Sequence, residues 1–387
     1  MLRLLPFDYP LRNIARRPLR SILTTAASAL VAALLVTTAA FVHGLESSHI
    51  ATAPPRTAIL LSRASEGDLL RSSIAPSVPS LVAADVSGIL SVEGEPAVSA
   101  EIHMGTDLHL QEDGPGYQAF VRGVTERAFL VHEAVTVIEG RPFGAREAII
   151  GRLTAEKLGI PPTELTVGRP ILVEGGSFTI SGIFAAPGTT LESEIWLPLG
   201  ELQGHAKRED LSAVFVRTRT EDALADVDYF AQRRLDLELT CMSAKAYYAR
   251  LAAYFAPIVA LAWAMAAIIG LAALASGANT LVASVQDRVR ELATLRSVGF
   301  KATALVVALM QEALLFAAAG GLLGLLVTRI LLARTSMSIA MTAFRIVADP
   351  VSVLVGLGGV LAVALAGTLP AALRVLRMPI ARALKET

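Results

Sequence analysis

Residues 251–286 read LAAYFAPIVALAWAMAAIIGLAALASGANTLVASVQ, a stretch of small and aliphatic side chains without a single charge. A helix that crosses a bilayer needs about 20 mostly apolar residues, so this stretch predicts a membrane span with a helical extension at one end. Residues 21–42 and 350–373 are also uncharged, and 302–328 contains only one charge, Glu312. Four such stretches favour four transmembrane helices over buried core helices. A signal peptide is the alternative for the first stretch, although its apolar run exceeds the usual signal-peptide core of roughly 7–15 residues.

The composition excludes several classes of protein. Of the 387 residues, 53% are hydrophobic and 18% are charged, against about 25% charged in a typical soluble domain. High hydrophobicity without net charge excludes a disordered chain. Lys and Arg total 34, as do Asp and Glu, so the chain is not a uniformly basic binder of nucleic acid. A single cysteine, Cys241, excludes an internal disulfide framework.

The charges that flank the apolar stretches predict the orientation, because Lys and Arg concentrate on the cytoplasmic side of a membrane. With four spans, both termini and the connection between the second and third stretches must share one side. All three segments are basic, so we place them in the cytoplasm. Their basic residues are Arg3, Arg12, Arg16, Arg17, Arg20, Arg288, Arg290, Arg296, Lys301, Arg374, Arg377, Arg382 and Lys385, against Asp8, Asp287, Glu291 and Glu386.

These observations divide the chain into nine segments of a membrane protein with four transmembrane helices and a large α+β extracytoplasmic domain between helices one and two. The predicted boundaries are a cytoplasmic N-terminal segment 1–20, helix one 21–43, the extracytoplasmic domain 44–250, helix two 251–285, a cytoplasmic segment 286–301, helix three 302–328, an external loop 329–349, helix four 350–373 and a cytoplasmic tail 374–387.

The segment 44–250 is acidic, with 18 Lys and Arg against 28 Asp and Glu, a net charge of −10. Its patterns mix strands with short helices, which is typical of an α+β domain. The turn at 114–116 suggests a subdomain boundary. We expect strands at 57–62, 213–217 and 235–240, a hairpin of 171–173 and 178–184 around a Gly-Gly turn, a strand and then a helix in 145–159, and a helix over 221–234.

A search for catalytic motifs finds none. No lysine follows a glycine, so the chain lacks a phosphate-binding P-loop, and no two histidines have the spacing of a zinc-protease helix. His103 and His109 flank Asp107 in a loose resemblance to a ligand cluster, but surface histidines in an external loop are the favoured interpretation. Residues 175–179 read as a turn instead of a nucleophile elbow. We expect no catalytic residue, metal or cofactor on this chain.

Two features of the third apolar stretch are distinctive. Glu312 lies about ten residues into it, near mid-bilayer depth, where a carboxylate costs at least roughly 2.5 kcal/mol and must face the bundle or be protonated. It has either a conformational or substrate-path role, or makes a structural hydrogen bond to a neighbouring helix. Gly320, Gly321 and Gly324 let helix backbones approach closely, either within the chain or across a dimer.

The cytoplasmic segment 286–300 reads QDRVRELATLRSVGF. Val289, Leu292, Leu295 and Val298 recur at roughly helical spacing with charges between them, which predicts a short amphipathic helix. An apolar stripe in this position needs a partner, either the membrane surface or another protein.

At this segment the sequence resembles the FtsX-like / MacB-type ABC transporter permeases. The run 290–299 looks like that family's connection between its second and third helices. Gln311-Glu312 with 320–324 is similar to its third helix, and 16–24 resembles its N-terminal part. In the external domain, 149–151 and 178–184 also fit.

The resemblance implies an inner-membrane permease subunit without catalysis of its own. It would form a homodimer or a permease heterodimer, contact membrane lipids, and bind a cytoplasmic ABC ATPase that holds the ATP and Mg, with a periplasmic adaptor as a further partner. Its external domain would move for export, efflux, or lipid and lipoprotein handling. The ATPase-coupling residues would be Arg288, Val289, Arg290, Glu291, Leu292, Leu295, Arg296 and Gly299.

Three other functions remain open at this stage. A mechanotransmitter that regulates a cell-envelope enzyme would share the same architecture. A membrane-anchored external sensor would bind a ligand through 44–250 and be indifferent to ATP. An autonomous membrane enzyme is the third alternative, and the motif search offers it no residue.

Overall fold

The computed structural model describes residues 8–332, 336–339 and 342–377, and the chain forms two compact units. The charges expected at Arg3, Arg382, Lys385 and Glu386 lie outside the described residues. The helical unit comprises 1–43, 257–335 and 347–387, and the sheet unit comprises 44–256 and 336–346.

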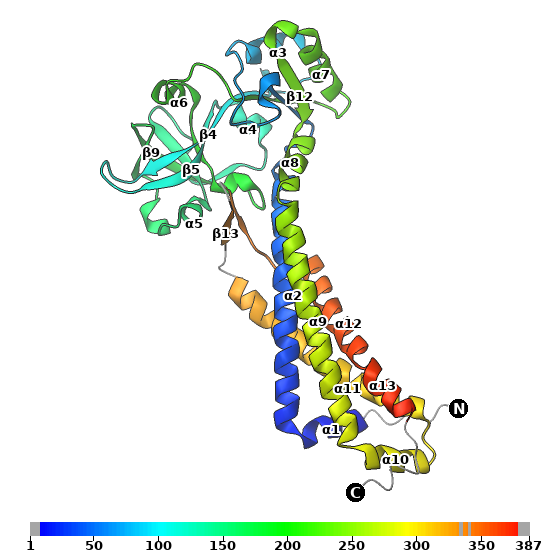
Figure 1. The fold of residues 1–387 in the computed structure, drawn as a ribbon. Helices are drawn as coiled ribbons and strands as arrows, with labels where there is room; N and C mark the ends of the chain where they lie inside the picture. Colours follow the sequence, from blue (N-terminus) through cyan, green and yellow to red (C-terminus); the bar gives the residue numbers. More distant parts are fainter. Residues whose placement is uncertain (1–7, 333–335, 340–341, 378–387) are drawn as a thin grey trace. The chain divides into compact units, whose positions relative to one another are not determined.

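Among the described residues, four helices are long and apolar enough to cross a membrane, which confirms the predicted four-span architecture. The last of them bends at Thr368, where one helix ends and a shorter one begins. The helices of the chain's membrane part are α1 (Asp8–Arg16), α2 (Pro18–Thr52), α9 (Ala256–Gln286), α10 (Val289–Ser297), α11 (Ala302–Leu332), α12 (Pro350–Gly367) and α13 (Leu369–Leu376) (Figure 1).

The second span begins later than the uncharged stretch of sequence. Helix α8 (Ala244–Ala253) ends before Tyr254, whose side chain is exposed, and α9 starts two residues further on. Ser243 caps α8, because its side-chain oxygen accepts a hydrogen bond from the backbone N–H of Ala246. Residues 251–255 therefore belong to a helix end and a turn in the sheet unit, so hydropathy alone overestimates this span.

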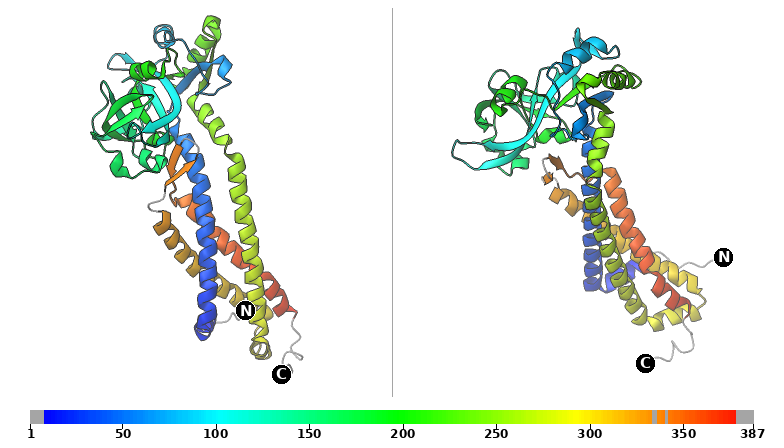
Figure 2. Two further views of the ribbon diagram at one scale, coloured as in Figure 1. Left: turned by 60° about the vertical axis from the view of Figure 1, so that its left-hand side comes forward. Right: turned by 45° about the horizontal axis from the view of Figure 1, so that its top comes forward.

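The sheet unit is built on a ten-stranded mixed sheet in the order β12-β1-β11-β4-β5-β10-β7-β9-β6, with β8 paired to β4 and β9. Strands β4 and β5 lie near the middle of this order and pair as a long hairpin, which is cyan in Figure 2. The strands are β1 (Thr57–Ser62), β2 (Ser91–Val92), β3 (Glu95–Pro96), β4 (Val98–His109), β5 (Gly116–Val124), β6 (Thr136–Gly140), β7 (Glu147–Gly151), β8 (Pro170–Val173), β9 (Gly176–Ala185), β10 (Ile195–Pro198), β11 (Ala213–Arg217) and β12 (Leu239–Ser243).

Short helices cover the sheet and join its strands. The buried aliphatic side chains of the strands, such as Ile102, Ile180 and Val214, form the main core with the apolar faces of these helices. The helices are α3 (Val78–Asp85), α4 (Ala128–Val131), α5 (Thr154–Leu158), α6 (Leu199–Ala206) and α7 (Leu224–Arg233), with 3-10 turns η1 (Arg63–Ser65), η2 (Pro162–Glu164), η3 (Thr190–Ser193) and η4 (Leu235–Leu237).

The predicted hairpin is present, but its turn is one residue earlier than expected. Strands β8 and β9 pair antiparallel from Pro170 to Val173, and Glu174 and Gly175 form the two-residue turn, with φ of 50° and 73°. Positive φ at both turn positions fits the twist of a two-residue hairpin and is the reason for glycine at the second position. Gly176 is instead the first residue of β9.

Three other local predictions need correction. Residues 235–240 do not form one strand: η4 occupies the first three and β12 starts at Leu239, because the alternating pattern extends past a left-handed Glu238. The turn at 114–116 closes the hairpin of β4 and β5 and marks no subdomain boundary. Helix α7 starts at Leu224, three residues after the predicted start.

The connection between α11 and α12, predicted as a short loop, contains a two-stranded hairpin that belongs to the sheet unit. Its strands are β13 (Ser336–Ile339) and β14 (Thr342–Arg345), and the backbone N–H of Ala343 donates to Ser193 Oγ at 3.0 Å. The end of α2 meets the same turn, since Thr190 N–H donates to Thr52 Oγ1 at 2.8 Å. Turn η3 is therefore hydrogen-bonded both to the end of α2 and to the hairpin that connects α11 and α12.

Candidate coupling site and the buried network of the sheet unit

The helix predicted in the connection between the second and third spans is α10. Its apolar side contacts the chain's own helices: Leu292 is 2% exposed and packs with Leu305 and Leu309 of α11 and Val375 of α13. Leu295 is partly buried against the same cluster. The apolar stripe therefore has a partner inside the helical unit, and the expected contact of Leu292 and Leu295 with another protein stays a prediction.

The opposite side of α10 is exposed. Arg290, Thr294 and Ser297 lie on it, and Val298 directly after the helix is 70% exposed, a high value for an aliphatic side chain. Val289 and Arg296 are intermediate, and Gly299 is an exposed left-handed residue with φ of 109° that ends the segment. This outer face is accessible to a binding protein, whereas Leu292 is buried.

Two polar contacts anchor α10 and the residue before it. The Tyr9 hydroxyl of α1 donates to Glu291 Oε1 at 2.9 Å. Burial, followed by this hydrogen bond, raises the pKa of Tyr9 to about 12. Arg288, which is 6% exposed, places Nη2 3.3 Å from Glu312 Oε2, so α1 and α11 both fix the start of α10.

Glu312 faces the bundle and is 7% exposed. Its Oε2 accepts a hydrogen bond from Asn13 Nδ2 at 2.7 Å in addition to the contact with Arg288. Both partners belong to the basic segments that flank the spans, α1 and the connection after α9. Glu312 thus contacts the basic segments that flank the spans, and its expected position near mid-bilayer depth stays a prediction.

The three glycines of α11 lie where other helices of the same chain approach. A Cβ at Gly320 would lie 2.5 Å from Ser28 Cβ, and one at Gly324 would meet the backbone of Ala29. Gly321 faces α12, where a Cβ would lie 3.0 Å from Leu357 Cδ2. Of the two interpretations left open above, the structure shows contacts within the chain, which close small-residue packing between α11 and both α2 and α12 explains.

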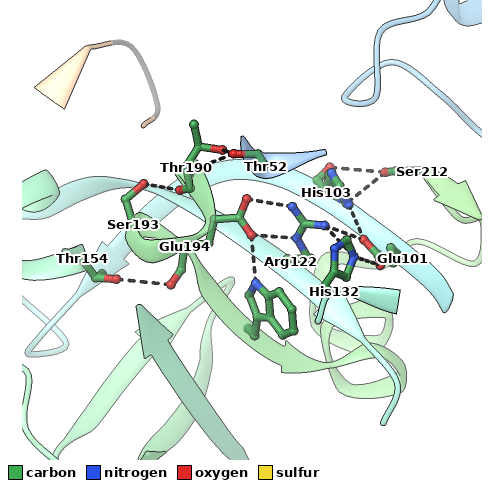
Figure 3. A network of polar contacts seen from close by, with 11 residues as sticks. Thr52, Glu101, His103, Arg122, His132, Thr154, Thr190, Ser193, Glu194 and Ser212 are labelled. Carbon is green, nitrogen blue, oxygen red and sulfur yellow. Dashed lines mark hydrogen bonds and ion pairs between the residues drawn. The ribbon is translucent and has the colours of Figure 1, made fainter. Parts of the chain in front are cut away.

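The sheet unit contains a buried charged network that sequence reasoning missed (Figure 3). Arg122 on β5 donates through Nε and Nη2 to Glu194 at 2.7 and 2.8 Å, and through Nη1 to Glu101 at 2.7 Å. His103 and His132 each place Nε2 against Glu101, at 2.8 and 2.7 Å. All five residues are at most 5% exposed.

The pKa shifts in this network follow from burial and from the mutual charges. Burial raises the pKa of Glu101, but the charges of His132 and Arg122 and the hydrogen bonds from both histidines outweigh it and hold the pKa well below its usual 4.5. Burial lowers the pKa of Arg122, but Glu194 and Glu101 raise it well above its usual value. Burial and then the Arg122 charge lower the pKa of His103. The buried charges of Glu101 and Arg122 therefore depend on their partners, and removing one partner leaves the others uncompensated.

The network lies where β4 changes its partner. Residues 98–101 of β4 pair with β11, and residues 102–109 pair with β5. Glu101 and His103 flank this change, so the network joins strands from both parts of the sheet. His103 is thus a buried strand residue, which corrects its interpretation as a surface histidine, and among the described residues no cluster of His, Cys, Asp and Glu could hold a metal. The available signal was one arginine in the apolar run of β5, with Glu101 and His103 two residues apart on one face of β4.

Comparison with known proteins gives the class of the chain. A family model described as the MacB-like periplasmic core domain matches residues 21–228, and one described as the FtsX-like permease C-terminal matches residues 263–380. The first match alone covers more than half of the sequence. The chain belongs to the family of FtsX/MacB-type ABC transporter permeases, and the four apolar helices with the MacB-like periplasmic domain fit a multi-pass inner-membrane protein.

Individual relatives are distant. The macrolide export ATP-binding/permease protein MacB of Marinobacter nauticus is 24% identical over 276 residues, which are 65% of this chain and 41% of that protein. The extracellular domain of the noncanonic ABC-type transporter YknZ from Gram-positive bacteria is 20% identical with a TM-score of 0.37, covering 48% of this chain and 99% of that one. The periplasmic region of MacB from Actinobacillus actinomycetemcomitans is 11% identical with a TM-score of 0.38, covering 50% and 92%.

Proposed function

We propose that this chain is the permease subunit of an ABC transporter, and that it converts ATP hydrolysis by a separate cytoplasmic ATPase into movement of its periplasmic domain. Family membership supports the ATPase partner, and the sequence contains no glycine-lysine pair from which a P-loop could be built. ATP and Mg would be held by the partner, and both termini would be cytoplasmic. Efflux, lipid or lipoprotein handling, and regulation of an envelope enzyme are the roles that such movement would serve.

The observation that carries the proposal is the set of contacts that join α10 to α1, α11 and α13. Leu292 packs it onto α11 and α13, Tyr9 ties it to α1, and Arg288 ties its start to Glu312. A helix held at several points transmits a displacement to all the elements that hold it. We assign the ATPase contact to the exposed face with Arg290, Thr294 and Val298, which revises the expectation that Leu292 and Leu295 make it.

The periplasmic end offers a matching point of transmission. Turn η3 contacts two other elements through hydrogen bonds. Its Thr190 N–H donates to Thr52 at the end of α2, and its Ser193 hydroxyl oxygen accepts from Ala343 N–H in the hairpin between α11 and α12. Glu194 follows this turn directly and is bound by Arg122 of the buried network. A displacement of either contact would thus act on the centre of the sheet, where β4 changes its partner.

Co-purification tests the cytoplasmic half of the proposal. We expect the detergent-solubilised chain to retain a P-loop ATPase, and Val298→Asp to remove most of it, because a charge would be buried in the contact. The melting temperature of the variant should stay at the wild-type value, since Val298 is exposed. Leu376→Asp places the same charge on an exposed site of α13 and is the matched control. Equal ATPase recovery from wild type and Val298→Asp would contradict the assigned face.

Thr52→Val tests the periplasmic half. The change removes the acceptor of the Thr190 N–H while keeping the side-chain shape. In the membrane-embedded complex we expect ATP to alter hydrogen exchange in the sheet unit of wild type and to alter it less in Thr52→Val. Ser48→Ala is the control, because the Ser48 hydroxyl donates only within α2, to Leu45 O. An unchanged ATP response in Thr52→Val would rule out this point of transmission.

A further inference from the structure

The helical unit contains a strongly basic pocket of about 600 Å³ near α10. Among the described residues, four arginines and two carboxylates line it, and these side chains come from α1, its junction with α2, and the junction between α9 and α10. The lining residues are Asn13, Arg16, Arg17, Gln286, Asp287, Arg288, Val289, Arg290 and Glu291.

Both carboxylates of this basic pocket already have partners. Asp287 accepts from Arg17 at 2.8 Å, and Glu291 accepts from the Tyr9 hydroxyl. Arg16 is exposed and has no hydrogen-bond or ion-pair partner among the described residues, and the same holds for the buried Nε and Nη1 atoms of Arg288. A buried guanidinium with two unmet donors is costly, so the pocket suits an anion with several oxygens, such as a phosphate group.

A second, apolar cavity of about 540 Å³ lies between α2, α9, α11 and α12. Its walls are mainly alanine, valine, leucine and glycine side chains, among them Leu23, Val31, Phe316 and Val360. Within the part of the chain that the structure describes, its charged lining residues are Arg20 and Glu312. Its volume is within the range of small-molecule sites, about 300–1,000 Å³, and its walls suit a hydrocarbon chain.

One ion pair has a partner in the lining of each cavity. Glu312 lines the apolar cavity and Arg288 lines the basic pocket, and their side chains are 3.3 Å apart. Arg20, three residues after Arg17 of the basic pocket, lines the apolar cavity and is anchored by a hydrogen bond to Thr280 O at 2.6 Å. A single ligand with an apolar part and an anionic head can therefore occupy both.

We propose that these cavities form a binding site for an anionic phospholipid, with the phosphate held by Arg16, Arg17 and Arg288 and an acyl chain in the apolar cavity. The phosphate oxygens would accept hydrogen bonds from the unmet arginine donors, and the acyl chain of the lipid would fill the apolar cavity. Arg290 lines the pocket and also lies on the exposed α10 face, but the residues assigned to the phosphate, Arg16, Arg17 and Arg288, are not on that face. Loss of lipid binding in an Arg16 variant with normal ATPase recovery therefore distinguishes this proposal from the ATPase contact proposed above.

Native mass spectrometry and thermal shift of the full chain in detergent test this proposal. The probes are phosphatidylglycerol, phosphatidylethanolamine, glycerophosphoglycerol and inorganic phosphate. We expect phosphatidylglycerol alone to remain bound and to raise the melting temperature. Equal effects of inorganic phosphate or glycerophosphoglycerol would mean a free phosphate site, and equal binding of phosphatidylethanolamine would mean no recognition of the anionic head. Either result overturns the proposal.

Two variants locate the site, each with a control on the same helix. Arg16→Gln should weaken phosphatidylglycerol binding about tenfold, as expected for loss of one charge-assisted contact, whereas Arg12→Gln, also exposed on α1 but not in the pocket lining, should not. Gly277→Leu should obstruct the apolar cavity, since open space surrounds its Cβ position. Gly270 has the same open surroundings and lines neither cavity, so Gly270→Leu is the control. Unchanged binding in both Arg16→Gln and Gly277→Leu would refute the location.

Discussion

Replacement of Arg122 by methionine is the most informative perturbation of the sheet unit. The change keeps most of the side-chain volume but removes three donors, two to Glu194 and one to Glu101. Both carboxylates stay buried in a place from which water is excluded. Removing one partner of a buried ion group typically costs about 3–5 kcal/mol. In a domain of 150–250 residues, each kcal/mol shifts the melting temperature by about 2–4 °C, so we expect a decrease on the order of 10 °C.

The pH dependence of this loss gives a second, independent check. The folded pKa of Glu101 lies well below 4.5, so the wild-type network contributes its full stability above that pH and loses it as the pH falls toward the folded pKa. Without Arg122 one of the charges that lower this pKa is gone, and Glu101 takes up a proton at higher pH. The difference in unfolding free energy between wild type and variant should therefore be largest near pH 7 and decrease toward pH 4.

Differential scanning fluorimetry of the full chain in detergent, between pH 4 and pH 7, measures both effects. Glu101→Gln added to Arg122→Met should recover part of the stability, since it removes one of the uncompensated charges. Arg141→Met is the matched control, because Arg141 pairs with Glu147 at an exposed position, where ion pairs contribute little. A melting temperature for Arg122→Met within error of wild type at pH 7 would refute the reasoning that the network holds the sheet together.

Three further predictions concern packing, a hydrogen bond and reactivity. Gly324→Leu should lower the melting temperature or the yield of folded protein, because a Cβ at this position meets the backbone of α2. Gly358→Leu should change neither, because open space surrounds the Cβ position at Gly358. Tyr9→Phe should cost about 0.5–1.5 kcal/mol in urea unfolding through loss of the hydrogen bond to Glu291, and no change would show that this contact is not formed in solution. Partial burial raises the pKa of Cys241 to about 12, so maleimide should label it slowly at pH 7.5 until the chain is denatured; rapid labelling of the native protein would contradict this shift.

The architecture could be predicted from the sequence because hydropathy and charge were summed over long segments. Four uncharged stretches and the basic segments beside them need no tertiary information, and α2, α9, α11 and α12 are where hydropathy places them. Local turn chemistry was informative as well, as the hairpin at Glu174-Gly175 shows. Boundaries were less accurate, since the turn at Tyr254 separates two helices inside one uncharged stretch.

The site could be predicted only in part, because burial depends on which elements meet. The spacing of Leu292 and Leu295 indicates an apolar face, but only the fold shows that α11 and α13 cover it. The pairing of Glu312 with Arg288 and Asn13 joins three segments that are far apart in sequence. The same holds for Arg122, whose partners lie on β4 and before β10, so the local traces of the network were the arginine in an apolar strand and the Glu101 and His103 pair on one face of β4.

The central claim is that the exposed face of α10 contacts an ATPase. A photo-crosslinking amino acid at Thr294, which is exposed on that face, tests it directly in intact cells. We predict a covalent product between this chain and a protein with a P-loop, absent when the crosslinker replaces Tyr254, an exposed residue of the sheet unit. Crosslinking at Thr294 only to lipid, or to no protein with a P-loop, would contradict the account.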